Sequence, residues 1–310
     1  MKCLITGAGG FIGSHLTEFI LAQSQSVVAV VRRRNDFLES LKGDIKIAYG
    51  DLLDGAFIKS LFEQHEPDIV FHLAAQSLPL SSWREPAQTF RVNLISSLKL
   101  FEAARRQRSA PLIIAASSSS VYAPGREESL LNEESPVQPG SIYAVSKLAM
   151  EQLAKIFRDA RGLKLICVRP FFIIGPRKEG DVCSDFARGI VRIERGEANE
   201  LPVGNLTSVR DFLDVRDAVS ALWQIAARGK TGAVYNICSG RGYSIGDLLA
   251  MFKKMALADV RVVSDPAKTR PIDDPIKTGD PARLTALGWK QRIDMDSSVS
   301  AILNYWRGVS

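Results

Sequence analysis

Residues 2–13 read Lys2-Cys3-Leu4-Ile5-Thr6-Gly7-Ala8-Gly9-Gly10-Phe11-Ile12-Gly13, a short apolar run that passes into a glycine-rich turn. We expect a strand over 2–6, then a turn and a helix that continues to about Gln23. That order suits a pyrophosphate, because glycines permit a tight turn and a close approach of backbone amides, and a helix N-terminus carries partial positive charge. The turn could be purely architectural, but its place in a first βαβ unit favours a dinucleotide site.

Apolar strands and helices alternate from this turn to about residue 170. We expect strands over 27–31, 45–49, 68–73, 111–116 and 165–170, and helices over about 56–63, 87–107 and 143–160. Such alternation predicts an α/β protein with a doubly wound parallel sheet, in which helices cover both faces.

The pattern loosens after residue 170. We expect helices over about 186–194 and 244–255, a helix that starts at Asp211 and runs to Ala227, and a strand over 233–237. No internal repeat or low-complexity linker separates the two parts. We therefore expect a dinucleotide-binding domain over 1–168 and a smaller α/β substrate-binding lobe over 169–310, with about 211–238 returning to pack on the first domain.

The composition is that of an ordinary globular protein, with 46% hydrophobic and 24% charged residues in 310. No apolar run is long enough to span a membrane, and no signal peptide is recognisable, so we expect a cytoplasmic protein. The four cysteines and three histidines lack metal-ligand spacing, which predicts reduced structural thiols and no metal site. The net charge of +6 is spread along the chain, which favours small anionic ligands over nucleic acid.

Two stretches in the middle of the chain carry candidate catalytic groups. They are Ser117-Ser118-Ser119-Ser120-Val121-Tyr122 and Tyr143-Ala144-Val145-Ser146-Lys147. Tyr143 and Lys147 share one helix face, so we expect the ammonium to lower the pKa of the phenol. Tyr143 would then exchange a proton near neutral pH, while Ser118 would hold a carbonyl or alcohol oxygen by a hydrogen bond. The alternative is a half-buried tyrosine beside a solvated lysine.

Residues at the strand ends are candidates for binding the rest of a dinucleotide. Arg32-Arg33-Arg34 follows the second strand, where an arginine suits the 2′-phosphate of NADP(H) and an acid would suit NAD(H); an exposed basic loop is the alternative. Asp51 could accept from the adenine amino group or cap the next helix. We interpret His72 as a core residue with satisfied hydrogen bonds, and we expect Asn93 to form a buried hydrogen bond.

These motifs together resemble the extended short-chain dehydrogenases/reductases, over essentially the whole chain. The matching segments are Thr6–Gly13, Asp51–Asp54, Leu73–Gln76, the serine strand, Tyr143-x-x-x-Lys147 and Arg169-Pro170. The resemblance implies a Rossmann-type sheet and a catalytic Ser118, Tyr143 and Lys147. It also implies a set of cofactor-binding residues, namely Gly7, Gly10, Phe11, Ile12, Gly13, Arg32, Asp51, Leu52, Leu73, Ala74, Ala75, Tyr143, Lys147 and Pro170.

Within that superfamily the sequence is similar to the GDP-6-deoxy-D-mannose reductases, which reduce GDP-4-dehydro-6-deoxy-D-mannose to GDP-D-rhamnose. The similarity lies in 73–77, 82–86, 203–206, 210–217, 235–245, 265–266 and 270–271. It implies NADP(H), with NAD(H) possible, and a GDP-linked 4-keto-6-deoxyhexose as substrate. The implied substrate-binding residues are Ser77, Ser118, Phe172, Arg210 and Arg270.

Two features qualify this resemblance. Arg210 and Arg270 suit a diphosphate because guanidinium groups match phosphate oxygens, although each could be a surface ion-pair residue. The reductase family usually reads Arg-Pro-Phe-Asn-His where this chain has Arg169-Pro170-Phe171-Phe172-Ile173, so two polar side chains near the sugar are replaced.

Three other functions are weighed against reduction. Nucleotide-sugar 4,6-dehydratases place Thr-Asp-Glu where this chain has Ser118-Ser119-Ser120, and serine hydroxyls cannot supply the acid and base that dehydration needs. A 4-epimerase would use the same Ser, Tyr and Lys with tightly bound NAD. A non-catalytic dinucleotide-binding redox sensor would be expected to lose the Tyr–Lys pair, which is intact here. Members of the superfamily commonly form homodimers through a four-helix bundle, here from the helices over 87–107 and 143–160.

Overall fold

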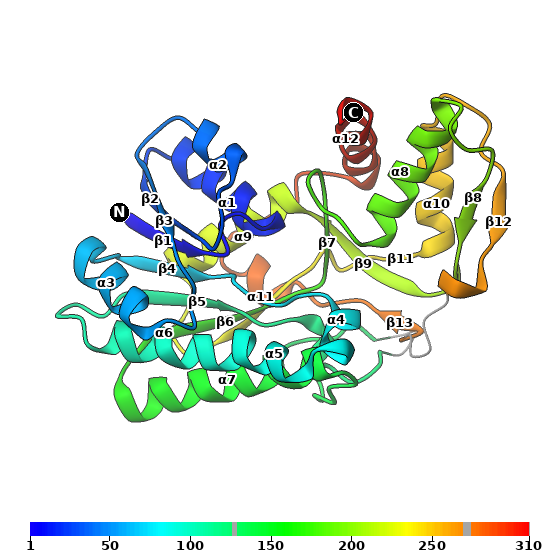
Figure 1. Ribbon diagram of the computed structural model, residues 1–310. Helices are drawn as coiled ribbons and strands as arrows, with labels where there is room; N and C mark the ends of the chain where they lie inside the picture. Colours follow the sequence, from blue (N-terminus) through cyan, green and yellow to red (C-terminus); the bar gives the residue numbers. More distant parts are fainter. Residues whose placement is uncertain (126–128, 269–273, 310) are drawn as a thin grey trace.

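The computed structural model describes residues 1–125, 129–268 and 274–309. A seven-stranded parallel sheet in the order β10-β6-β5-β4-β1-β2-β3 forms its centre (Figure 1). The strands are β1 (Lys2–Thr6), β2 (Ser26–Val31), β3 (Ile45–Tyr49), β4 (Ile69–His72), β5 (Leu112–Ala116), β6 (Lys164–Pro170) and β10 (Val234–Ile237). The predicted α/β class with a doubly wound parallel sheet is confirmed.

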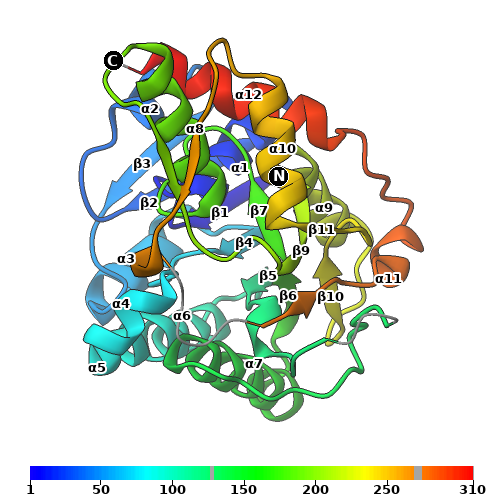
Figure 2. The same ribbon diagram turned by 90° about the vertical axis from the view of Figure 1, so that its right-hand side faces the viewer.

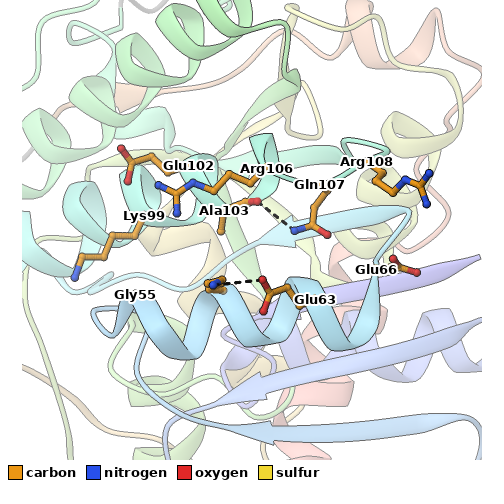
Figure 3. A pocket seen from close by; sticks show the side chains of 10 residues that line it. Gly55, Glu63, Glu66, Lys99, Glu102, Ala103, Arg106, Gln107 and Arg108 are labelled. Atoms are coloured by element: carbon orange, nitrogen blue, oxygen red, sulfur yellow. Dashed lines mark hydrogen bonds and ion pairs between the residues drawn. The ribbon is translucent and has the colours of Figure 1, made fainter.

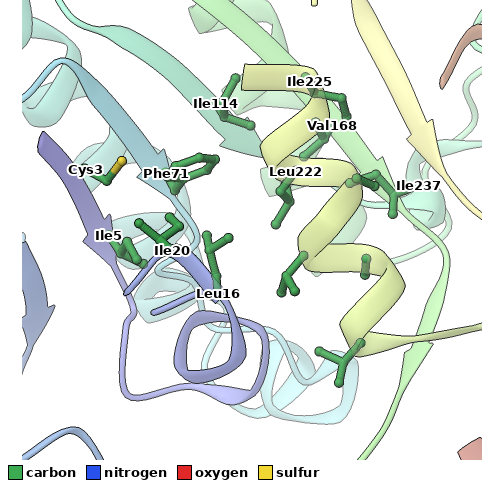
Figure 4. Close-up of a cluster of buried hydrophobic side chains, with 14 of the residues drawn as sticks. Cys3, Ile5, Leu16, Ile20, Phe71, Ile114, Val168, Leu222, Ile225 and Ile237 are labelled. Atoms are coloured by element: carbon green, nitrogen blue, oxygen red, sulfur yellow. The ribbon is translucent and has the colours of Figure 1, made fainter. Parts of the chain in front are cut away.

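Helices cover both faces of this sheet because successive strand residues point to opposite sides. On β5, Ile113 packs with one buried cluster and Ile114 with the other. One face carries α1 (Phe11–Ala22) and α9 (Val215–Arg228), and the other carries α3 (Gly55–His65), α6 (Ser96–Arg105) and α7 (Ile142–Arg161). Figure 4 shows side chains of α1 and α9 meeting Phe71 of β4 in the first cluster. The short helix α2 (Asp36–Ser40) follows β2.

The second half of the chain contributes a further lobe (Figure 2), and this lobe has its own hydrophobic core. Its helices α8 (Val182–Glu194), α10 (Ile245–Lys254) and α12 (Met295–Gly308) pack on one another. Strand β9 (Val209–Asp214) pairs with three others, and β8 pairs with β12. The remaining elements are β7 (Phe172–Ile174), β8 (Leu201–Val203), β11 (Gly242–Ser244), β12 (Val262–Ser264), β13 (Ile276–Lys277) and α11 (Ala282–Thr285).

The two halves of the chain interleave. Strand β10 pairs with β6 and forms an edge of the large sheet, and α9 packs against α1. The sheet of the first half therefore includes a strand from the second half. The division of the chain at residues 168 and 169 stays a prediction.

Two element predictions differ from the structure. The helix predicted over 87–107 is confirmed as one continuous helical segment, but it contains a π-helical turn that was not predicted: α5 (Pro86–Phe90) passes into this turn (Arg91–Ile95) and then into α6, and a further short helix, α4 (Pro79–Arg84), precedes it. The helix predicted to start at Asp211 starts at Val215, because residues 209–214 form β9 and Asp214 caps α9 by accepting from the Arg216 amide at 2.8 Å. Residues 210–214 are all buried, so this strand lacks the alternation that reveals a half-exposed strand.

None of the described helices combines the length and apolar character needed to cross a membrane. The four cysteines are free and buried. Among the described residues, no three His, Cys, Asp or Glu side chains are grouped so that they could hold a metal ion.

Candidate active site

The glycine-rich turn lies where the strand order reverses, between β1 and β4, and ligands of doubly wound sheets bind at such a point. Gly7 has φ +70°, and a Cβ there would lie 2.9 Å from Ala74 Cα. A Cβ on Gly13 would lie 2.2 Å from the Gly7 carbonyl oxygen. Helix α1 begins after Gly10, which provides no side-chain cap. The backbone is therefore closely packed, and the first turn of α1 is open to an anion such as a pyrophosphate.

The three predicted catalytic residues converge at the carboxyl end of β5. Ser118 follows this strand and caps a short turn, accepting from the Ser120 amide at 3.1 Å. Tyr143 lies in the first turn of α7, and its hydroxyl forms a hydrogen bond with Ser118. Lys147, one turn further along α7, donates from Nζ to the Ala116 carbonyl at 2.7 Å. Tyr143 and Lys147 are 8% and 5% exposed, so the alternative of a half-buried tyrosine beside a solvated lysine is wrong.

The pKa of Tyr143 differs from the expectation. Burial raises it above its ordinary value, and the hydrogen bond from Ser118 opposes that rise. The expected lowering by Lys147 is absent, because the ammonium is directed to the Ala116 carbonyl and lies 6.0 Å from the Tyr143 ring centre. Burial also lowers the pKa of Lys147 to about 8. The site therefore holds a neutral phenol at neutral pH.

A buried hydrogen-bond network supports the catalytic helix. Asn93, in the π-helical turn, accepts from the Gln76 amide at 2.8 Å and donates to the Gln76 carbonyl at 3.1 Å. Its Nδ2 also donates to Ser146 at 2.9 Å, and Ser146 donates to the Tyr143 carbonyl at 2.7 Å. The buried hydrogen bond expected of Asn93 is confirmed. Asn93 thus ties the segment after β4 to the first turn of α7.

His72 is a buried structural residue, as the sequence indicated. Its ring nitrogens each lie 2.8 Å from a hydroxyl, those of Thr6 and Ser97. Burial lowers the pKa of His72 to about 3, so its imidazole is neutral at physiological pH.

The adenine-side candidates lie at the ends of β2 and β3. Arg32 and Arg33 are exposed, and within the described chain neither forms an ion pair or hydrogen bond, whereas Arg34 pairs with Asp36 and Glu39. Asp51 does not cap α3; its Oδ1 accepts from the Leu53 amide, and Asp54 is the cap. The remaining cofactor candidates lie at the same edge of the sheet or pack beneath it. Phe11 and Ile12 begin α1, Ala75 follows Ala74 after β4, and Pro170 ends β6. Leu52 and Leu73 are largely covered by the hydrophobic cores.

The substrate candidates are partly brought together. The Arg210 guanidinium lies 5.3 Å from the Phe172 ring centre and donates to the Val209 carbonyl at 2.8 Å, among other contacts. At 5% exposure Arg210 is not a surface ion-pair residue. Ser77 is exposed and directly follows Gln76, whose backbone is hydrogen-bonded to Asn93. Arg270 lies outside the described residues.

A surface groove between α3 and α6 contains none of these residues (Figure 3). Its lining mixes acidic and basic side chains, including Lys59, Glu63, Lys99, Glu102 and Arg106. Two other residues were missed by sequence reasoning. Glu151 continues the face of Tyr143 and Lys147 by one more turn, a spacing that is readable in the sequence, whereas nothing local marks Asp211 as a buried carboxylate.

Comparison with known proteins agrees with this geometry. The family model described as GDP-mannose 4,6 dehydratase matches residues 4–302. The chain therefore belongs to this family, within the extended short-chain dehydrogenases/reductases.

Among individual relatives, the chain is 35% identical to GDP-6-deoxy-D-mannose reductase of Pseudomonas aeruginosa, across 98% of this chain and 97% of that protein. A solved structure of RMD from Pseudomonas aeruginosa complexed with NADPH is 32% identical, with a TM-score of 0.86 over 100% of this chain and 99% of that one. The UDP-glucose 4-epimerase of Thermotoga maritima, solved with UDP-glucose, is 27% identical, with a TM-score of 0.91 over 100% and 99% of the two chains.

Proposed function

We propose that this protein reduces the C4 keto group of GDP-4-dehydro-6-deoxy-D-mannose to give GDP-D-rhamnose, with NADPH as the reductant. The observation that carries this proposal is the convergence of Ser118, Tyr143 and Lys147 at the carboxyl end of β5, on the sheet edge that also carries the glycine-rich turn. The full-length similarity to a GDP-6-deoxy-D-mannose reductase supports the choice of substrate.

The chain's own residues have defined roles in this reaction. NADPH, when bound, supplies a hydride. Tyr143, a neutral phenol at neutral pH, gives its proton to the C4 oxygen of the sugar. Ser118 donates a hydrogen bond to that oxygen and so stabilises the charge that develops on it. Lys147 holds the first turns of α7 against β5 through the Ala116 carbonyl and places a positive charge near the phenol.

The ligands are held by residues at the same sheet edge. The glycine-rich turn and the start of α1 take the pyrophosphate of the cofactor, and Arg32 takes its 2′-phosphate, with NAD(H) a weaker substitute. Arg210 and Arg270 bind the diphosphate of the sugar nucleotide. Phe172 and Ser77 contact the sugar.

Dehydration and epimerisation fit the site less well. Residues 118–120 carry three hydroxyls and no carboxylate, which leaves elimination of water without its acid and base. An epimerase would retain NAD through the cycle, and the exposed Arg32 and Arg33 favour NADPH instead.

Incubation of the purified protein with GDP-4-dehydro-6-deoxymannose and NADPH tests the proposal. We expect the near-ultraviolet absorbance of the reduced cofactor to fall in proportion to the ketosugar added, and NMR to identify GDP-D-rhamnose. A folded protein that leaves the absorbance unchanged would refute reduction. Sugar interconversion without net loss of NADPH would identify an epimerase.

The protein is further proposed to act in the cytoplasm as a homodimer. Helices α6 and α7 lie side by side along one side of the molecule (Figure 1), and α7 exposes Val145 and Ile156 there. Apolar side chains of this kind would pack against the same helices of a second copy. Ile156→Glu should convert dimer to monomer in light scattering, while Leu257→Glu, which alters the more exposed Leu257, should leave the mass unchanged.

A further inference from the structure

Helix α7 carries a third polar residue on the face of Tyr143 and Lys147. Glu151 lies four residues after Lys147 and is 7% exposed. Arg169 of β6 binds both of its carboxylate oxygens, from Nε to Oε1 at 3.0 Å and from Nη2 to Oε2 at 2.7 Å. A buried two-bond pair of this kind fixes the carboxylate in one orientation.

Arg169 is itself held in place. Its Nη1 donates to the Glu133 carbonyl at 3.2 Å, and its guanidinium lies 4.7 Å from the centre of the Tyr122 ring. Tyr122 lies four residues after Ser118 and donates to Asn236 Oδ1 at 2.7 Å. The Glu133 backbone and Tyr122 therefore hold Arg169, and Arg169 in turn holds the Glu151 carboxylate.

The other titratable groups that face Lys147 are neutral at physiological pH. Burial lowers the pKa of His72, on β4, to about 3 and raises that of Cys167, on β6, to about 12. Burial also raises the pKa of Tyr143. Among the described residues, Glu151 is thus the anion that acts on Lys147, while the charge of Arg169 is matched by its bonds to Glu151.

Burial and Glu151 act on Lys147 in opposite directions. Burial lowers the pKa of Lys147, the negative charge of Glu151 opposes this, and the pKa that results is about 8. Without that charge, the ammonium would lose its proton within the physiological range. A neutral amine would no longer assist proton transfer from Tyr143.

We propose that Glu151, held by Arg169, is a positioning residue that supplies the counter-charge of the Lys147 ammonium. This inference depends on the proposed function only for the role of Lys147 in catalysis. Arg169 keeps the carboxylate in the interior, so the pair acts on the site through the charge of Lys147.

The direct test is an NMR titration of lysine-labelled protein without substrate or cofactor. The Cε shift of Lys147, assigned by its loss in Lys147→Met, should titrate with a midpoint near 8. Glu151→Gln should lower this midpoint by about one pH unit or more, because an opposite charge is removed. Glu151→Asp should restore most of it. Asp159→Asn, on the exposed side of α7, should leave it unchanged. An unshifted midpoint in Glu151→Gln would overturn the proposal.

Glu151→Gln leaves the buried Arg169 without its partner, and this variant could fail to fold for that reason. A double variant avoids the problem. E151Q/R169Q removes both charges, and its Lys147 midpoint should still lie below that of the wild type. A midpoint equal to or above the wild-type value would overturn the proposal. In the active enzyme, the alkaline limb of kcat should move to lower pH with the NMR midpoint, whereas KM should change little. If no ketosugar is reduced, the proposed function fails, but the titration still decides the role of Glu151.

Discussion

Lys147 lies one helical turn beyond Tyr143, yet its Nζ donates to the carbonyl oxygen of Ala116 at 2.7 Å and remains 6.0 Å from the Tyr143 ring centre. The lysine therefore anchors α7 to the end of β5, and the tyrosine hydroxyl is left to Ser118. Because burial raises the pKa of Tyr143, the phenol is protonated before the reaction. That state suits a proton donor in ketone reduction.

Removal of the Tyr143 hydroxyl should abolish most of the activity. We expect Tyr143→Phe to lower kcat by about 10²- to 10⁴-fold, the usual contribution of a positioned acid. Circular dichroism should show an unchanged fold. Tyr305→Phe, on the distant helix α12, should keep wild-type kcat. Equal activity in Tyr143→Phe and the wild type would remove Tyr143 from the mechanism.

Loss of the Asn93 side chain should affect both stability and rate. Asn93→Ala would leave the Gln76 amide and carbonyl without their partner, and we expect a loss of about 3 kcal/mol in the free energy of unfolding. The rate kcat should fall because Ser146 and the first turn of α7 lose their support. Asn304→Ala, at an exposed site, should change stability by less than about 0.5 kcal/mol. Similar stability losses in both variants would show that the hydrogen bonds of Asn93 do not stabilise the fold.

Cofactor preference should depend on Arg32. We expect Arg32→Ser to raise the KM for NADPH by about tenfold or more, since a charged hydrogen bond to phosphate is lost, and to leave the KM for NADH unchanged. Arg34→Ser should have the smaller effect, because Arg34 is engaged with Asp36 and Glu39. Steady-state kinetics of each variant with NADPH and with NADH gives the two KM values. A parallel rise for NADPH and NADH would argue against a 2′-phosphate contact.

Two glycine substitutions should have opposite effects. A Cβ at Gly13 would lie 2.2 Å from the Gly7 carbonyl oxygen, so Gly13→Ala should lower the free energy of unfolding by about 3 kcal/mol or more. Gly55, at the start of α3, has nothing within 4 Å of such a Cβ. Gly55→Ala should therefore be neutral or stabilise the fold by up to about 1 kcal/mol. Urea unfolding compares the two, and a tolerated Gly13→Ala would refute the close approach.

Asp211 should make stability depend on pH. Its buried carboxylate accepts from Ser239, Gly240 and Gly279, but burial outweighs these bonds and raises its pKa to about 6 from 3.8. A folded-state pKa above the unfolded value means that its contribution is full below about pH 4 and is lost as pH rises through 6. The contribution lost across this window is about 3 kcal/mol.

Urea unfolding at several pH values between 4 and 6 tests this effect. Asp211→Asn should remove that decline with rising pH, although the amide will also weaken the hydrogen bonds at every pH. The surface variant Asp296→Asn should follow the wild-type curve. Parallel curves for Asp211→Asn and the wild type would show that Asp211 does not titrate in this window.

Prediction succeeded for elements with a strong local pattern. Strands β1 and β3 have the predicted bounds, since their apolar runs are flanked by turn residues. It missed the π-helical turn around Asn93 inside a helix that was otherwise predicted, and it failed at β9. The π-helical turn carries Asn93, whose side chain bonds to Gln76 and Ser146, and β9 is buried among other strands. Neither feature produces a hydrophobic periodicity that can be read from the sequence.

The amino-acid sequence alone determined the α/β class, the glycine-rich turn and the shared face of Tyr143 and Lys147, because helical and strand periodicity and the steric freedom of glycine are local properties. Only the tertiary structure decided that Ala116 holds Lys147, that the pKa of Tyr143 rises, and that Arg169 holds Glu151. Desolvation and ion pairing depend on which distant segments meet in the interior, and that information does not exist in a linear pattern.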